Sequence, residues 1–281
     1  MTYKTIAVHL DVRPRCAARV ALAARLAMRH GSRLIGIAPT GLPDVIVAMN
    51  SAVPDAIECI ALSAADLREN AEVAMRAFYR ECRRSGVASF HAELVVAEAL
   101  DAVVRHGRCS DLIVVGQTDT GAPIDGLARD FPQQVLLHAG GPVLVVPCAG
   151  TFDSLGERVL VGWKDTREAA RALRDSLPLL RDARHVSLVE IGPVPSDPGG
   201  DGSLEAAAAW LDSHGIACDA HREIERAGAG AGEQLLSRAG ELGVDLVVCG
   251  GYGHSRLREW ALGGVTRHLL GHMTVPTLLS H

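Results

Sequence analysis

Short apolar runs alternate along the whole chain with longer stretches in which apolar residues recur at helical spacing. The short runs are typical of buried strands, and the longer stretches are typical of amphipathic helices. Gly31 follows the first long stretch, at a position where a left-handed glycine commonly ends a helix. In the first half this pattern predicts strands at 4–10, 33–38, 91–96, 111–115 and 142–147, and helices at 13–30, 55–84, 98–106 and 129–138.

The same order of elements returns in the second half. Thr166 and Ser203 stand where helix N-caps are expected. A regular alternation of strand and helix implies a parallel sheet with helices on both faces. We therefore expect an α/β protein made of two tandem open, mainly parallel five-stranded sheets of Rossmann-like type. The predicted strands are 158–163, 185–191, 217–224, 244–249 and 275–279, and the predicted helices are 166–180, 203–214, 229–242 and 265–272.

The repeat is visible in the letters of the sequence. The run from Asp111 to Gly116 (DLIVVG) matches the run from Asp245 to Gly250 (DLVVCG). In both halves 25 residues separate that final glycine from the proline that opens the last strand. We therefore predict an N-terminal domain at 1–147, a linker at 148–157 and a C-terminal domain at 158–281.

Glycines cluster after the predicted strand that ends at Cys249. Gly250, Gly253, Gly263 and Gly264 lie between this strand and the helix that contains Thr266. Without a Cβ, glycine lets backbone N–H groups approach an anion closely, and a helix N-terminus adds unpaired donors. The spacing is neither the Walker A pattern nor the dinucleotide fingerprint. The glycines favour an anion site at the carboxyl edge of the sheet, although tight turns alone would also use them.

The spacing Gly250-x2-Gly253-x9-Gly263 resembles the nucleotide-binding signature of universal stress proteins. This resemblance covers nearly the whole chain as a tandem pair, and it implies a fold of the universal stress protein type. It also implies that the C-terminal half binds ATP or a related adenine nucleotide, with Mg²⁺ accompanying a triphosphate. The residues that it points to as nucleotide-binding are Gly250, Gly253, Gly263, Gly264, Val265, Thr266, Lys164, Asp165 and Ile191.

Two positions depart from the family pattern. The family places Ser or Thr where this chain has Gly264, and the nearest hydroxyl comes two residues later, at Thr266. It also places an acid after the first strand, where the C-terminal half has Lys164 followed by Asp165. Lys164 could approach phosphate as a point charge, and Asp165 could replace the acid if the turn shifts by one residue. Both also fit ordinary solvated loop charges.

The N-terminal half keeps the acid of the family pattern, Asp11, and the first glycine, Gly116, but not the other three glycines. Superposition across the conserved gap places Asp119 on Gly253, Arg129 on Gly263 and Asp130 on Gly264. Carboxylates repel phosphate oxygens, so we expect this half to have lost nucleotide binding in the usual mode. A shifted loop that binds through other residues is the alternative.

The composition narrows the range of functions. The net charge is −5 and 22% of the residues are charged, so nothing suggests a basic surface for nucleic acid. Seven scattered cysteines without a Cys-x-x-Cys motif favour buried thiols in a reducing compartment over disulfides or zinc. The sequence shows no transmembrane run, and its start leads directly into a strand, so we expect a cytoplasmic protein without a signal peptide. We assign no metal ligand and no catalytic residue.

These observations leave three hypotheses of different classes. The first is a stress-response module that signals through ATP bound in its C-terminal half. The second is an interaction protein of the same fold without nucleotide, and the third is a slow ATP-hydrolysing relative. The last strand of each half is an apolar edge that needs covering, so we expect the halves to pair through these strands. Residues 45–49 are a candidate homodimer contact, with local packing as the alternative.

Overall fold

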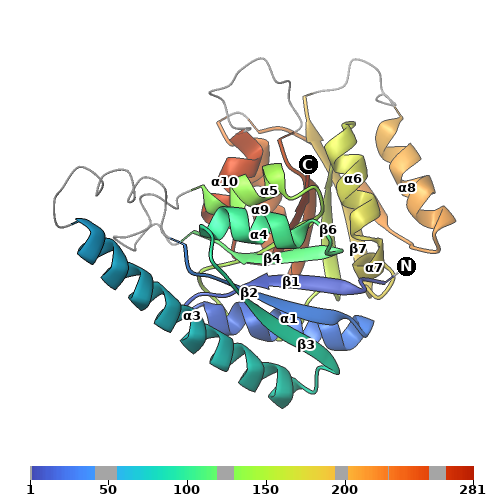
Figure 1. The fold of residues 1–281 in the computed structure, drawn as a ribbon. Helices are drawn as coiled ribbons and strands as arrows, with labels where there is room; N and C mark the ends of the chain where they lie inside the picture. The colour runs from blue at the N-terminus through green and yellow to red at the C-terminus, as the bar shows by residue number, and fades with distance from the viewer. Residues whose placement is uncertain (1, 42–55, 119–129, 194–201, 227, 253–263) are drawn as a thin grey trace. The chain divides into compact units, whose positions relative to one another are not determined.

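The computed structural model describes residues 2–41, 56–118, 130–193, 202–226, 228–252 and 264–281, with side chains of 56–63 excepted. Its residues form two compact groups, Thr2–Gly116 and Gln117–His281. Residues 45–49, Asp119, Arg129, Gly253 and Gly263 lie outside the described residues. Figure 1 labels the elements of both groups.

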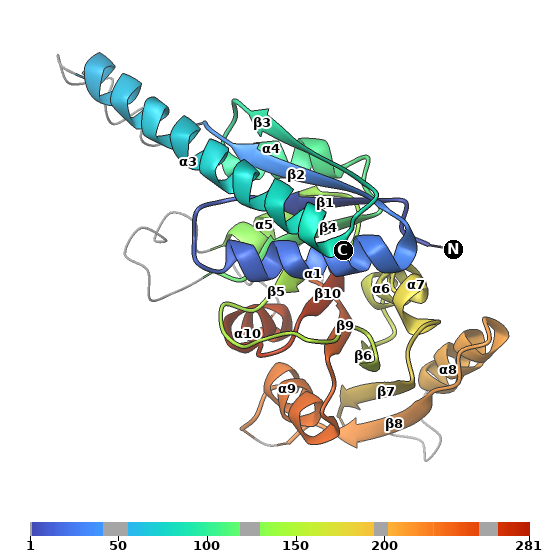
Figure 2. The ribbon, with the colours of Figure 1, turned by 90° about the horizontal axis from the view of Figure 1, so that it is seen from below.

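The first group is a parallel sheet of four strands in the order β3-β2-β1-β4. Helices α1 and α3 lie side by side along it, as Figure 2 shows, and α4 packs on β2 and β1. Gly31 ends α1 with a φ of 64°, so the expected left-handed glycine is confirmed. The elements are β1 Thr5–His9, α1 Cys16–His30, β2 Arg33–Pro39, α3 Ala56–Ser85, β3 Ser89–Val95, α4 Ala99–Gly107 and β4 Leu112–Gly116.

The second group is a six-stranded sheet in the order β5-β10-β9-β6-β7-β8. All neighbours are parallel except β5 and β10, which pair antiparallel with Leu144 opposite Leu278. The elements are α5 Phe131–His138, β5 Val143–Val146, β6 Arg158–Trp163, α6 Arg167–Asp175, α7 Leu177–Leu180, β7 His185–Gly192, α8 Ser203–Ser213, β8 Asp219–Ile224, α9 Ala231–Leu242, β9 Leu246–Gly250, α10 Gly264–His272 and β10 Thr277–Ser280.

The burial of each strand follows its place in the sheet. The strands β5 and β10, and β9 up to its final glycine, are buried on both faces; β5 and β9 are continuous apolar runs, and β10 places two leucines between the buried Thr277 and Ser280. The outermost strands β3 and β8 are more exposed and carry charged residues. This is the pattern that helices on both faces of a parallel sheet produce, and it confirms the predicted α/β architecture with five strands in each half.

Two details of the predicted helices differ. The helix expected at 166–180 is interrupted at Ser176, because Pro178 follows and the Ser176 hydroxyl bonds the Leu173 carbonyl. Ser203 does not cap its helix. It is the first residue of α8, after Gly202, and its hydroxyl oxygen lies 3.4 Å from the Trp163 indole nitrogen.

The strand β5 groups with the C-terminal residues because it is hydrogen-bonded to β10. The two compact groups therefore differ from the two halves of the sequence, because β5 belongs to the first half but pairs with a strand of the second. The division into 1–147, 148–157 and 158–281 stays a prediction.

Candidate nucleotide site

A cavity of about 550 Å³ lies at the carboxyl ends of β6, β7 and β9. The chain leaves β6 toward one side of the sheet and reaches β9 from the other, so β6 and β9 flank the point where the strand order reverses. Ligands of open α/β sheets bind in this crevice. Seven of the nine residues that we associated with nucleotide from the sequence line the cavity, namely Lys164, Asp165, Ile191, Gly250, Gly264, Val265 and Thr266.

Gly250 is a glycine for reasons of packing. A Cβ placed on it would lie 2.5 Å from the backbone nitrogen of Ala169 and 2.7 Å from the carbonyl carbon of Glu168. Both atoms belong to the first turn of α6, so only glycine lets this helix approach the end of β9. Packing against α6 therefore explains why residue 250 is glycine, and no ligand is needed to explain it.

The two residues after β9 already use their amides. The Gly251 amide donates to the Ser280 carbonyl at 2.8 Å, and the Tyr252 amide donates to the Thr266 hydroxyl at 3.2 Å. Thr266 is only 3% exposed. Its hydroxyl therefore accepts a hydrogen bond from a backbone amide of the loop after β9, whereas the resemblance pointed to a contact with nucleotide.

Further donors at this edge belong to the start of α10. The first N–H groups of a helix have no partner within it. Among the described residues no atom would lie within 4 Å of a Cβ on Gly264, and Gly264 lines the cavity. The start of α9 lies against it, since a Cβ on Gly232 would come 3.0 Å from the Val265 carbonyl oxygen.

The turn after β6 brings a helix start to the same cavity. Thr166 accepts a hydrogen bond from the Ala169 amide at 3.3 Å, so the expected N-cap of α6 is confirmed. Lys164 and Asp165 precede it as exposed side chains on the cavity wall. Lys164 therefore stands where the family pattern has an acid, with Asp165 beside it.

Sequence analysis missed several residues of the wall. Glu190, near the end of β7, lies 2.6 Å from Arg222 in an ion pair that neutralises it. Trp163 is the last residue of β6, and Glu225 directly follows β8. Their place at the ends of strands is the one signal that could have found them. Val189, Leu235 and Cys249 make the inner wall apolar. Burial raises the pKa of the Cys249 thiol to about 12, which keeps it protonated and unreactive near neutral pH.

The sheet edge of the N-terminal group is built differently. Arg19 of α1 is 3% exposed and lies 3.0 Å from Asp11, the acid of the family pattern. Its Nε also donates to the His9 carbonyl at 2.8 Å, and a Cβ on Gly116 would lie 2.5 Å from its Nη1. Burial raises the pKa of Asp11, but Arg19 more than offsets this and holds it below the usual value. A side chain of the protein itself thus engages the acid at this edge.

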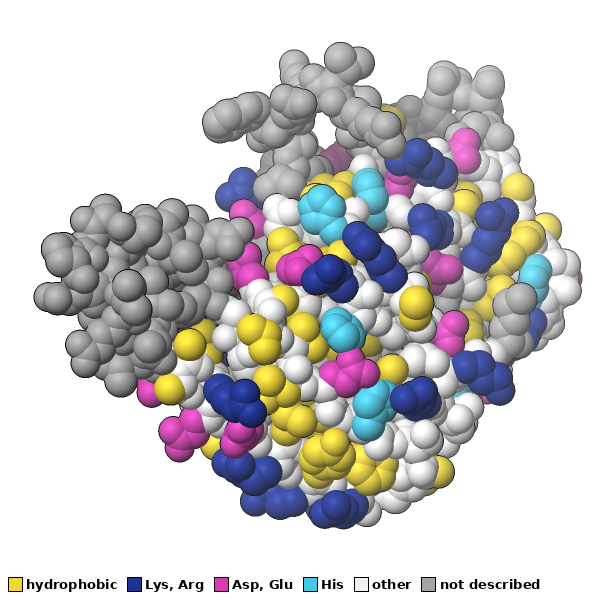
Figure 3. Space-filling model, in the orientation of Figure 1, with side chains coloured by type: hydrophobic (Ala, Val, Ile, Leu, Met, Phe, Trp, Pro, Cys, Tyr) yellow, Lys and Arg dark blue, Asp and Glu magenta, His cyan; other side chains and the backbone are white. Residues whose placement is uncertain are grey.

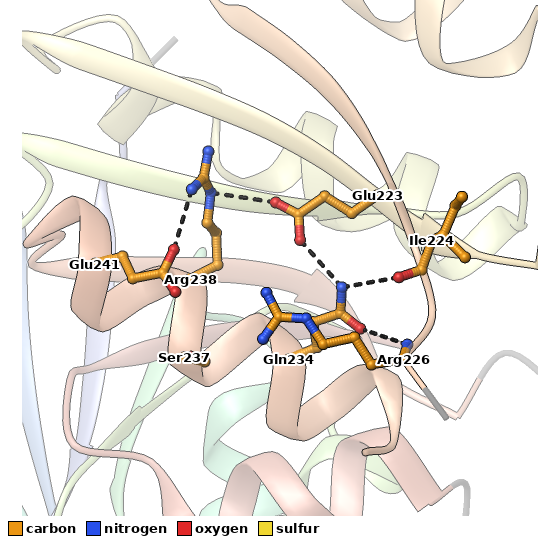
Figure 4. Close-up of a pocket in the computed structure, with 7 residues that line it drawn as sticks. All are labelled: Glu223, Ile224, Arg226, Gln234, Ser237, Arg238 and Glu241. Carbon is orange, nitrogen blue, oxygen red and sulfur yellow. Dashed lines mark hydrogen bonds and ion pairs between the residues drawn. The ribbon is translucent and has the colours of Figure 1, made fainter. Parts of the chain in front are cut away.

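A smaller hollow of about 270 Å³ lies between β8 and α9 (Figure 4). Gln234 is 4% exposed and donates to both Glu223 and the Ile224 carbonyl, each at 3.1 Å. Arg238 lies 3.2 Å from Glu223 and 3.1 Å from Glu241 in ion pairs. Because these polar groups bond one another, the hollow is accounted for by the packing of α9 against β8.

The surface carries charges of both signs. On the face in Figure 3, Lys and Arg side chains are interspersed with Asp and Glu among the described residues. Across the described part of the chain, no three His, Cys, Asp or Glu side chains are grouped to hold a metal ion. None of the described helices combines the length and the hydropathy needed to span a membrane.

Comparison with known proteins gives a family match for the C-terminal half and a fold for the chain. Residues 156–281 match the model of the universal stress protein family. A universal stress protein from Archaeoglobus fulgidus DSM 4304 is 15% identical, with a TM-score of 0.75, over 98% of this chain and 95% of that chain. A Pseudomonas aeruginosa UCBPP-PA14 structure assigned to the same family is 15% identical, with a TM-score of 0.62, over 99% and 93%. No curated protein matches the chain.

Proposed function

We propose, from the match of residues 156–281 to the universal stress protein family model, that the chain is a stress-response module that binds ATP in the cavity of its C-terminal half. The observation that carries the proposal is the meeting of Lys164, Ile191 and the start of α10 around one cavity of about 550 Å³. These segments are far apart in the sequence, and the resemblance associates each of them with nucleotide.

The two sides of the cavity suit the two ends of a nucleotide. Val189, Ile191 and Leu235 offer an apolar wall for a planar base. The start of α10 offers unpaired N–H groups and the positive end of a helix dipole for phosphates. In this proposal Gly264 and Val265 contact the phosphates through their backbone.

The charges on the wall favour a metal-bound triphosphate over a bare one. Asp165 and Glu225 line the cavity together with one lysine, Lys164, and the third acid, Glu190, is paired with Arg222. Mg²⁺ bound to the phosphates would reduce their negative charge and their repulsion from these carboxylates. We include Mg²⁺ in the proposal as a companion of ATP and assign it no protein ligand.

A second candidate is an interaction protein of the same fold that holds no nucleotide. It is favoured by the amides of Gly251 and Tyr252, which are already hydrogen-bonded to the protein. Under this alternative the glycine loop serves packing alone.

Isothermal titration calorimetry with ATP, with and without Mg²⁺, separates the two candidates. Mass spectrometry of the gently denatured protein would add which nucleotide it carries from the cell. Trp163 lines the cavity, so its fluorescence should change as ATP binds. Absence of heat, of a fluorescence change and of any co-purifying nucleotide would overturn the proposal in favour of the interaction protein.

A further inference from the structure

Tyr252 adopts a backbone conformation that is unfavourable for its residue type. Its φ is 60°, and it is the only described residue other than glycine with a positive φ. The left-handed region crowds a bulky side chain against the backbone, so surrounding structure must hold such a residue in place. Tyr252 also lines the cavity proposed for ATP.

The groups that hold Gly251 and Tyr252 in place come from several elements. Gly251 donates to the Ser280 carbonyl, and its own carbonyl accepts from His281 at 3.1 Å. The Tyr252 ring meets the His281 ring edge-on, with centroids 6.3 Å apart. The Tyr252 amide is tied to Thr266 in α10. The backbone at Tyr252 and the start of α10 are therefore mechanically linked.

One contact with this corner comes from α5, which belongs to the first half of the sequence. A Cβ on Gly251 would lie 2.6 Å from Cδ2 of Leu136, so the leucine packs directly on the glycine. Leu136 is 2% exposed. Burial raises the pKa of the Tyr252 phenol, and the Asp130 carboxylate at the start of α5 adds to the effect.

A second contact ties the same part of the chain to α10. The Gln117 side chain donates to the Leu270 carbonyl at 2.8 Å and accepts from the Cys148 amide at 2.9 Å. Leu136 therefore contacts Gly251, just after β9, and Gln117 contacts the last turn of α10.

We propose that Leu136 is a positioning residue for nucleotide binding: by packing on Gly251 it holds Tyr252 in its left-handed conformation and thereby fixes the start of α10. This inference rests on the proposed function for its effect on affinity. It gives the first half of the chain a task in the site of the second half. In this proposal the first half supports the site, whether or not it binds a ligand itself.

The test is a double-mutant cycle on the full chain. Leu136→Val shortens the side chain that reaches Gly251, and Leu137→Val, a half-buried neighbour on the same helix, is its matched control. Asn enters the left-handed region more readily than Tyr. Tyr252→Asn should therefore make the support from Leu136 less necessary.

We expect Leu136→Val to raise the Kd for ATP about tenfold in the native background and less than about twofold with Tyr252→Asn, a coupling within the usual range for linked residues. Leu137→Val should leave Kd unchanged in both backgrounds. Equal effects of Leu136→Val in the two backgrounds would overturn the proposal, as would equal effects of the two leucine variants.

Hydrogen exchange at the Tyr252 amide gives a readout that needs no nucleotide. Leu136→Val should speed exchange at this amide, because the bond to Thr266 depends on the held backbone. Leu137→Val should not. If the native protein fails to bind ATP, the proposed function falls, and this measurement alone decides the role of Leu136.

Discussion

The Thr266 hydroxyl accepts a hydrogen bond from the Tyr252 amide at 3.2 Å, and so connects the loop after β9 to the first turn of α10. The resemblance to universal stress proteins placed this threonine among the nucleotide-binding residues. The bond gives it a structural task that operates with or without ligand. Its consequences can be measured separately from those of the helix start beside it.

Replacement of Thr266 tests this bond. Thr266→Val keeps the shape but removes the acceptor, so the Tyr252 amide loses its partner. We expect a loss of about 1 kcal/mol in the free energy of unfolding, measured by urea denaturation. Thr266→Ser keeps the hydroxyl and should recover most of it. A valine variant as stable as the native protein would show that the bond contributes nothing.

A variant at Gly264 should keep the stability of the protein while losing affinity for ATP. A Cβ at this position would meet no described atom within 4 Å, and a carboxylate at a helix N-terminus favours the helix. Gly264→Glu should therefore fold at least as well as the native protein while repelling phosphate. We expect its affinity for ATP to fall by about tenfold or more, in calorimetry.

Gly264→Gln is the neutral control of nearly equal size. It should bind more tightly than the glutamate variant, because it adds bulk but no charge. Equal affinities for the two variants would mean that the phosphates do not lie at the start of α10.

Gly250→Ala should destabilise the protein. The added methyl group would lie 2.5 Å from the backbone of Ala169, and backbone cannot rotate away as a side chain can. Overpacking of this kind costs about 1–3 kcal/mol. Gly192→Ala is the matched control, since Gly192 ends β7 at the same cavity with no atom within 4 Å of a Cβ. Thermal unfolding should show a lower Tm for the first variant only.

His9 should make stability depend on pH. Burial, followed by the neighbouring Arg19, lowers the pKa of His9 to about 3, whereas an unfolded histidine titrates near ~6.5. Between these values the unfolded state binds the extra proton, so this contribution is complete above about pH 6.5 and is lost as the pH falls. The slope from this one group is about 1.4 kcal/mol per pH unit.

His9→Gln removes the titrating group. Urea denaturation between about pH 4 and 7 should give a flatter dependence for this variant than for the native protein. Parallel curves would show that His9 is protonated in the folded state as readily as in the unfolded one.

Much of the fold followed from the sequence because the strongest signals were local. The apolar runs that became β4 and β9, and the glycine at 31, each predict structure without knowledge of distant residues. Ser203 shows the limit, since its hydroxyl faces Trp163, which lies 40 positions away. No local sequence pattern around Ser203 predicts this distant partner.

The residues of the candidate site could be predicted where only one role explains a residue. They could not where packing and ligand binding would each explain the same residue. Lys164, Ile191 and Gly264 were named from the resemblance to a known family, and in the structure they line one cavity. Gly250 and Thr266 were assigned to ligand from their spacing, yet packing against α6 and a bond to Tyr252 explain them as well. Arg19 and Leu136 gave no signal, because each acts on a glycine or a carboxylate contributed by another element.

The contact between Gly232 and Val265 has a consequence for handling the protein. It brings the positive ends of two helices, α9 and α10, against each other. Like helix ends repel, and any small anion that settles near them lowers that repulsion. Sulfate or phosphate in a buffer should therefore stiffen this corner and compete weakly with nucleotide, so affinities measured in chloride and in phosphate will differ.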